Sequence, residues 1–204
     1  MKVYYAPGTC AIGIQILLEE IGKPYESVLV DLANQAQMKA PYLAVNPKSK
    51  VPALERDDGS VLTEYQAISV WLGLTNPDKH LIPADAERHA RMLEAMDYIV
   101  ATMHMQSWAR IWRPMKFTDN AAEFPVLKAR GEEMFVKDFA LMDKTLGDKP
   151  WVVGDFSLAD PALFFVSWWA ADRIKFPLPP RVAAHYERMK ARPSVQRALA
   201  VHGL

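Results

Sequence analysis

The dipeptide Val51-Pro52 constrains this chain more than any other short stretch. Proline has no amide hydrogen, so Pro52 cannot donate to a sheet ladder, and an X-Pro bond is the kind that adopts the cis form at low cost. Most X-Pro bonds are trans, but a cis bond here would leave the N–H and C=O of Val51 facing solvent. An exposed backbone edge of this kind can bind another extended chain as an added strand. The sequence therefore predicts a peptide-binding edge at Val51.

The residues after Pro52 predict a β-hairpin that ends at an acidic residue. Asp57-Asp58-Gly59 between apolar runs is a strong signal for a hairpin with a two-residue turn. The chain then returns through Val61-Leu62 to Glu64, where the strand pattern gives way to a helical one. We expect the Glu64 carboxylate to lie at a strand-to-helix junction.

The first twenty residues predict a cysteine at the start of a helix. Lys2 to Tyr5 is typical of a short strand, and Ala11 to Ile21 has the apolar spacing of a helix that begins next to Cys10. The positive end of a helix lowers the pKa of a thiol from about 8.5 toward roughly 3.5–7.5, which would make Cys10 reactive. The alternative is that Cys10 is a small buried apolar residue without a chemical role.

Past residue 74 the pattern becomes almost entirely helical, which predicts a domain boundary near Thr75 to Pro83. We expect long helices over 87–112 and 121–146 and a very apolar, buried helix over 160–174. Ser157-Leu158-Ala159-Asp160 fits an N-terminal capping pattern, so Asp160 is interpreted as structural. Pro179-Pro180 and Arg192-Pro193 predict breaks before two short final helices.

His104 has two readings. By i,i+4 spacing it shares one face of the 87–112 helix with Trp108 and Trp112, so this face is aromatic and carries one polar group, the imidazole. Such a face is typical of an ordinary packed interface, and it also suits a pocket for a small apolar ligand.

Composition excludes several classes of function. The 204 residues are 50% hydrophobic, and 24 basic residues balance 24 acidic ones without a dense Lys/Arg cluster, so nothing favours nucleic acid. One cysteine cannot form an internal disulfide, no apolar run reaches the ~18 residues that span a bilayer, and no leader segment opens the chain, so we expect a cytoplasmic protein. The five histidines include no i,i+4 pair and no G-x-G-x-x-G follows a strand, so we expect neither a metal nor a nucleotide site.

Taken together, the motifs resemble those of the glutathione transferase superfamily and are most similar to the bacterial beta class. The resemblance rests on Tyr4 to Cys10, the strand expected over 28–32, Asn46 to Leu54, Asp57-Asp58-Gly59, Leu62-Thr63-Glu64, Val153 to Asp160 and Arg192 to Val195. It implies an α/β thioredoxin-like domain over 1–76 that binds glutathione, followed by an all-α helical bundle over 84–204 that carries the electrophile pocket.

The resemblance also assigns roles to single residues. It implies that Cys10 and His104 lie beside the glutathione sulfur, and that Val51, held by a cis Pro52, pairs its backbone with the cysteinyl group. Further contacts to glutathione are implied for Tyr5, Gln35, Glu64, the N–H of Tyr65 and Asp97. The family uses the position of Asp97 from a partner subunit, so a homodimer is implied, and Tyr5, His104, Trp108 and Trp112 are expected to line the electrophile pocket.

Three departures bear on the function. Ala11 stands where beta-class chains usually have Ser, Gln35 where they have Lys, and Tyr65 where they have a small residue. The expected activity is conjugation of the glutathione thiol to small hydrophobic electrophiles. Two alternatives stay open: thiol transfer or peroxide reduction through Cys10, and a non-catalytic interaction protein with the same fold.

Overall fold

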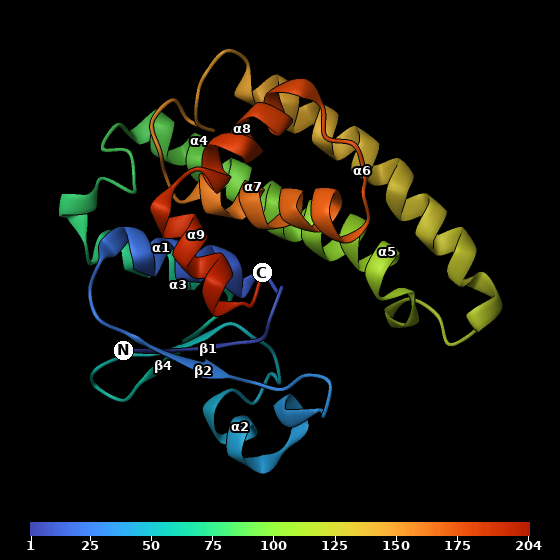
Figure 1. The fold of residues 1–204 in the computed structure, drawn as a ribbon, viewed down its shortest axis with the longest axis horizontal. Helices are drawn as coiled ribbons and strands as arrows, with labels where there is room; N and C mark the ends of the chain where they lie inside the picture. The colour runs from blue at the N-terminus through green and yellow to red at the C-terminus, as the bar shows by residue number, and fades with distance from the viewer.

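A computed structural model describes residues 1–204, and Figure 1 shows its two parts, a small sheet with its helices and a larger helical part. The sheet contains β1 (Lys2–Tyr5), β2 (Glu26–Leu29), β3 (Ala53–Glu55) and β4 (Val61–Thr63) in the order β2-β1-β3-β4. β1 pairs parallel to β2 and antiparallel to β3, and β3 and β4 form the hairpin. This arrangement confirms the predicted thioredoxin-like fold.

Three helices accompany the sheet, namely α1 (Ala11–Ile21), α2 (Ala40–Val45) and α3 (Tyr65–Leu74). In Figure 1, α1 and α3 lie between the sheet and the helical part, whereas α2 lies on the far side of the sheet. α1 is buried along most of its length, which explains why it lacks a polar face.

Two local predictions differ from the structure. The strand expected over 28–32 is β2, Glu26–Leu29, because its parallel register with β1 ends where Tyr5 meets Leu29. The hairpin turn contains three residues, Asp57 to Gly59, between Arg56 and Ser60, whose backbone N–H and C=O bond at 2.9 Å. Gly59 has φ +81°, the left-handed conformation that three-residue hairpin loops require.

The helical part is built on one long helix that combines α4 (Ala86–Asp97), a π-helical segment (Tyr98–Trp108) and α5 (Ala109–Trp112). This confirms the helix predicted over 87–112. α6 (Phe124–Leu146), α7 (Ala159–Trp168, continued as a π turn over Trp169–Arg173), α8 (Pro180–Lys190) and α9 (Pro193–Val201) complete the bundle. Short 3-10 turns lie at Ala36–Met38, Pro77–Lys79, Pro114–Lys116 and Ala121–Glu123. None of these helices combines the length and apolar character that crossing a bilayer demands.

α7 forms the centre of the core, since all of its residues are buried. The Asp160 carboxylate accepts from the backbone amides of Ser157 (2.8 Å) and Val152 (2.9 Å), and it lies 3.0 Å from Nε2 of His185. These contacts confirm the structural role predicted for Asp160. The apolar core runs without interruption from Val3 in β1 to Val195 in α9, so the two parts share one core.

Candidate functional site

A cavity of about 180 Å³ lies between the two parts of the fold. Its N-terminal wall consists of the loop residues around Cys10 and Val51 together with Leu32 and Gln37, and its helical wall consists of residues from 104–116 together with Trp169 and Arg173. Segments far apart in the sequence therefore supply one site.

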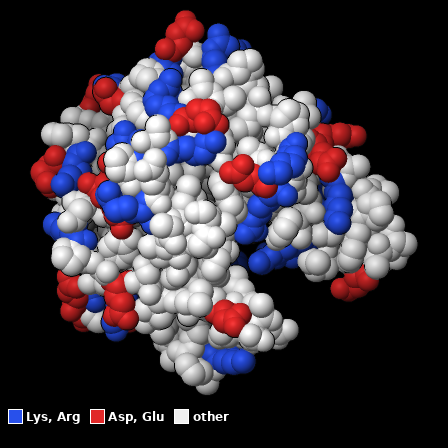
Figure 2. Space-filling model, viewed as in Figure 1, with Lys and Arg blue, Asp and Glu red and all other residues white.

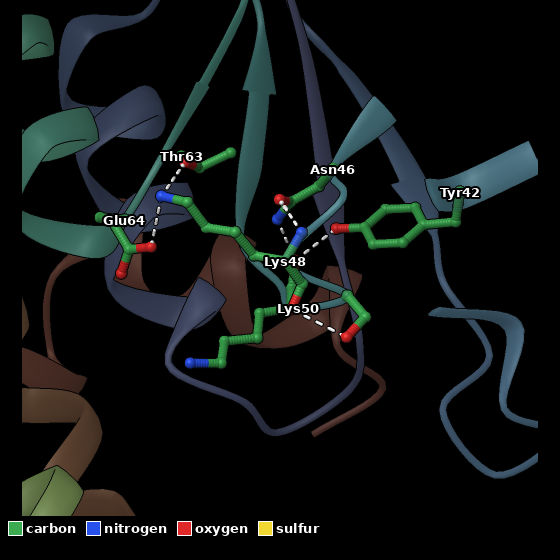
Figure 3. Close-up of polar contacts among 7 residues, drawn as sticks. Tyr42, Asn46, Lys48, Lys50, Thr63 and Glu64 are labelled. Atoms are coloured by element: carbon green, nitrogen blue, oxygen red, sulfur yellow. Dashed lines mark hydrogen bonds and ion pairs between the residues drawn. The ribbon is translucent and has the colours of Figure 1, made fainter. Parts of the chain in front are cut away.

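The backbone at Val51 forms an unpaired peptide edge on this cavity. The Val51-Pro52 bond is cis, as predicted, and neither the N–H nor the C=O of Val51 bonds to another backbone group. Figure 3 shows how the preceding residue is anchored: the Lys50 carbonyl accepts from the Tyr42 hydroxyl (2.6 Å) and from Nδ2 of Asn46 (2.7 Å). Because Tyr42 and Asn46 are both buried, the loop presents Val51 in a fixed position.

Cys10 lies at the N-terminus of α1, but its thiol is not acidified there. The side chain is buried, and this desolvation raises the thiol pKa to about 12, despite the opposing influence of its own backbone amide and Arg113. The prediction of a lowered pKa is therefore wrong, because burial outweighs the helix terminus. Sγ lies 3.9 Å from the Val51 carbonyl oxygen, so a neutral S–H sits beside the peptide edge.

The junction between β4 and α3 carries Glu64 in an unusual backbone conformation, with φ +72° and ψ 128°. This backbone conformation is strained for a residue other than glycine, and strained residues cluster at binding sites. Figure 3 shows the exposed Glu64 carboxylate pairing with Nζ of Lys48 at 2.8 Å. No backbone carbonyl accepts from the amides of residues 65–67, so the start of α3 offers free donors.

The Tyr65 side chain points into the core and away from the cavity. Its ring packs edge-on against Phe165, with centroids 5.1 Å apart, and its hydroxyl lies against Gly13 of α1. Tyr65 therefore contributes only its backbone to the surface at the start of α3.

His104 reaches the cavity from the π-helical segment. Its half-buried ring packs edge-on against Trp169 (4.7 Å) and Phe165 (5.7 Å), and Nδ1 is buried without a partner. Burial, followed by the charges of Lys116, Arg113 and Lys50, lowers the pKa of His104 to about 3. The imidazole is therefore neutral at pH 7 and borders the same cavity as Cys10.

Trp108 and Trp112 also border the cavity, as expected, and they stack with ring centroids 5.3 Å apart and planes 11° apart. Trp108 stacks in turn on Trp169, with centroids 5.0 Å apart. Trp108 is buried, whereas Trp112 is 46% exposed and offers indole surface to a ligand.

Four cationic side chains complete the lining, Lys50 from the loop and Arg113, Lys116 and Arg173 from the helical part. No carboxylate lines the cavity. Burial, followed by the charges of Arg113 and Lys50, lowers the pKa of Lys116, and burial followed by the charge of Arg113 lowers the pKa of Arg173. Figure 2 shows Lys and Arg side chains in the hollow between the sheet-containing part and the end of the helical part near α5.

Three sequence-predicted residues lie elsewhere. Tyr5 is absent from the cavity lining because its hydroxyl donates to the Val201 carbonyl (3.1 Å), so its expected place in the electrophile pocket is wrong. Gln35 is exposed outside the lining, and Gln37, whose Oε1 is buried without a partner, takes a place on the wall instead. Asp97 is exposed and accepts from Nε2 of Gln66 in its own chain.

Sequence reasoning also missed the four cations, Trp169 and Gln37. Only the loop residue Lys50 stands near a motif; Arg113 and Lys116 lie just beyond the end of α5, and Arg173 ends the π turn after α7, so no local pattern marks them as a group. Asn46 was noticed as part of the Asn46 to Leu54 stretch, but its role as an anchor for the Lys50 carbonyl was not.

Comparisons with known proteins agree with this geometry. Residues 8–75 match the family model "Glutathione S-transferase, N-terminal domain". The chain is also 36% identical over 209 residues to glutathione S-transferase GstA of Escherichia coli O157:H7, covering all of both chains. The chain belongs to the glutathione transferase superfamily.

Solved structures of glutathione transferases share the whole fold. A glutathione transferase homologue from Sulfitobacter with bound glutathione is 33% identical, with a TM-score of 0.91 over 100% of this chain and 98% of that one. A bacterial beta-class glutathione S-transferase from Sphingomonas chungbukensis is 30% identical, with a TM-score of 0.87 over all of both chains. These findings confirm the predicted resemblance and the glutathione transferase function, which is that of an enzyme.

Proposed function

We propose that this enzyme conjugates the glutathione thiol to small electrophiles in the cavity between its two parts. The observation that carries the proposal is a peptide edge at Val51 that has no backbone partner and whose carbonyl oxygen lies 3.9 Å from the Cys10 thiol on the same wall. A peptide docked on Val51 as an added strand places its cysteinyl side chain next to Cys10.

The two ends of glutathione find complementary groups on the N-terminal part. The free amides at the start of α3 suit the γ-glutamyl carboxylate, and the exposed Glu64 carboxylate suits the γ-glutamyl ammonium. Lys50 and the unpaired Oε1 of Gln37 lie near the other end, where a carboxylate can meet Lys50. Gln37 and Lys50 thus take the place first expected for Gln35.

The mechanism follows from the protonation states. Cys10 keeps its proton because its pKa is about 12, so it donates its S–H to the glutathione sulfur and does not attack the substrate. A neutral His104 supplies a second donor from the helical part, and the cationic wall favours the thiolate further. The thiol proton passes to solvent, a C–S bond forms, and the leaving group departs with its electron pair.

The two alternatives differ in what they need from the site. Disulfide exchange through Cys10 requires a thiolate, which a pKa of about 12 makes scarce at neutral pH. A non-catalytic interaction protein would have no need for free donors and a shared cavity. The test is melting temperature with and without glutathione, together with conjugation to 1-chloro-2,4-dinitrobenzene. A glutathione-dependent stabilisation with conjugation supports the proposal, whereas the absence of both supports the interaction protein.

We also propose a homodimer with a role in detoxification, as the resemblance implies, and a cytoplasmic location, as expected from the composition. Asp97 is exposed on α4 and bonds Gln66, the residue after Tyr65, so it lies close to the start of α3. In a twofold dimer Asp97 of one protomer is proposed to reach the γ-glutamyl group in the other. Sedimentation at micromolar concentration tests this: a monomer that conjugates normally contradicts it.

A further inference from the structure

The four cations of the cavity share one lining that contains no carboxylate, and none of them has an acidic partner. The ion pairs of this chain involve other basic residues, such as Lys48 with Glu64 and Arg88 with Asp155, and none includes Lys50, Arg113, Lys116 or Arg173. The whole chain has as many acidic as basic residues, so this local excess does not reflect composition. Like charges in one cavity repel, and an anionic ligand removes that cost.

Glutathione alone does not account for the excess. Its two carboxylates and its ammonium are matched on the N-terminal part by the free amides of residues 65–67, Glu64 and Lys50. Three cations remain, and all three belong to the helical wall. The glutathione thiolate can balance at most one of these three cations. At least two positive charges therefore remain without a counter-charge beside the aromatic face.

The remaining cations adjoin flat aromatic surface. The guanidinium of Arg173 lies 5.2 Å from the ring centroid of Trp112 and 5.0 Å from that of Trp168. Its Nη2 also abuts Gly8, where an added Cβ would lie 1.9 Å away. Arg113 directly follows Trp112 and precedes the 3-10 turn Pro114–Lys116, and Lys116 ends that turn. The cavity thus combines an open indole surface with several positive charges.

We propose that the second substrate is a planar electrophile that carries a carboxylate, an aromatic or conjugated acid whose ring lies against Trp112 and whose carboxylate pairs with Arg113 and Lys116. This inference rests on the proposed conjugation and narrows the expected substrate class from small hydrophobic electrophiles to anionic aromatic ones. For a chloronitrobenzoate, the glutathione sulfur forms a bond to the chlorine-bearing carbon. Chloride then leaves with its electron pair, and the thiol proton goes to solvent.

The test compares 4-chloro-3,5-dinitrobenzoate with its primary amide, which has the same shape and no charge. Each kcat/KM is divided by the uncatalysed rate constant, because the amide is the more reactive arene. We expect the wild type to favour the carboxylate by at least about tenfold, the typical effect of one charge-assisted contact. Arg113→Gln with Lys116→Gln should lower this preference about tenfold or more. A preference near one in the wild type, or one that survives the double substitution, overturns the inference.

Two controls separate the possible failures. Lys128→Gln removes an exposed cation of α6 outside the cavity, and its preference should match that of the wild type. Glutathione affinity is measured by thermal shift in every variant. If the double variant loses as much affinity for glutathione as it loses preference for the carboxylate arene, the inference is overturned, because the cations then bind glutathione.

A binding measurement keeps the inference testable if the enzyme conjugates neither arene, a result that would defeat the proposed function. The unreactive pair 3,5-dinitrobenzoate and 3,5-dinitrobenzamide is titrated while tryptophan fluorescence is recorded, since Trp108 and Trp112 line the cavity. At least about tenfold tighter binding of the carboxylate, lost in the double variant, supports an anion site. Equal binding of the two compounds overturns it.

Discussion

The indole Nε1–H of Trp169 donates a 2.9 Å hydrogen bond to the carbonyl oxygen of Gly8. Trp169 continues the buried α7, whereas Gly8 lies two residues before Cys10 in a tight turn with φ +64°. The core of the helical part therefore positions the loop that carries the thiol. Such a bond contributes about 1 kcal/mol and fixes where the loop stands relative to His104.

We predict that Trp169→Phe, which keeps an aromatic ring next to Trp108 but loses the Nε1–H, raises the KM for glutathione several-fold. The free energy of unfolding should fall by about 1–2 kcal/mol, since the buried Gly8 carbonyl loses its donor. Steady-state kinetics with varied glutathione and a urea titration measure the two effects. Trp151→Phe is the matched control, because the Trp151 indole lies outside the cavity. Equal KM values in both variants would contradict the prediction.

Cys10 and His104 should act on one sulfur atom from opposite walls. We expect Cys10→Ala to lower kcat/KM for conjugation about threefold to tenfold, the effect of one hydrogen bond, and His104→Gln to lower kcat more than it raises KM. Because both groups address the same atom, the double variant should depart from the product of the single effects. Cys10→Ser serves as the control that retains a donor. Unchanged rates in His104→Gln would assign that residue to packing alone.

The raised thiol pKa predicts slow alkylation of the folded protein. With a pKa of about 12, Cys10 is almost entirely protonated at pH 7.5, so iodoacetamide should modify it at least about a hundredfold more slowly than it modifies the urea-unfolded chain. Intact-mass spectrometry over time follows the reaction, and the single cysteine makes the mass shift unambiguous. Folded and unfolded rates within a few-fold of each other would show that Cys10 is acidified after all.

Half-buried His104 and buried His202 make stability fall in mild acid. Burial, with nearby cations, lowers the pKa of His104 to about 3 and that of His202 to about 4. Between these values and the unfolded pKa of about 6.5, the unfolded chain binds more protons, so stability rises with pH up to about 6.5 and is lost as pH falls below it. As the pH falls from 7.5 to 5.5, each histidine should lower the free energy of unfolding by about 1 kcal/mol.

Urea denaturation at the two pH values tests this in the wild type and in His104→Phe. The variant should lose about half of the pH dependence, because Phe cannot take up a proton. His80→Phe is the control, since His80 is exposed on the surface. An identical pH dependence in all three proteins would contradict the assignment.

Gly13 of α1 has no room for a side chain. A Cβ at this position would lie 2.3 Å from the Tyr65 hydroxyl oxygen and 2.8 Å from its ring. Gly13→Ala should therefore destabilise the protein by about 1–3 kcal/mol, although alanine favours helix more than glycine does. Adding Tyr65→Phe removes the nearest atom and should recover part of the loss, which thermal denaturation of the single and double variants measures. A stabilising Gly13→Ala would contradict the prediction.

Local patterns were enough to predict most of the fold. Ala11–Ile21 has the predicted helix bounds because apolar spacing and the left-handed Gly22 at its end are local signals. Where β2 ends, by contrast, depends on its partner, since β1 stops at Tyr5. The register between two strands is a long-range property that local composition does not carry.

The site could be predicted where it lies on a short motif or on one face of a single helix, as His104, Trp108 and Trp112 do. Val51 and Pro52 are contiguous, so the peptide edge was found, whereas the charge of the cavity comes from Lys50, Arg113, Lys116 and Arg173, spread over more than half of the chain. The thiol pKa was predicted with the wrong sign because the helix terminus is visible in the sequence and the burial of Cys10 is not. Tyr5 was misplaced for a similar reason: its hydroxyl partner is Val201, near the other end of the chain.

Gly8 is held from three directions by late parts of the chain: its amide donates to Nδ1 of His202 (3.0 Å), its carbonyl accepts from Trp169, and Arg173 packs against its Cα. A ribosome completes the first ten residues long before it reaches residue 202. The turn before Cys10 consequently stays without these three contacts until nearly the whole chain has been synthesised. The loop that carries Cys10 is among the first segments to be made and among the last to take its final shape.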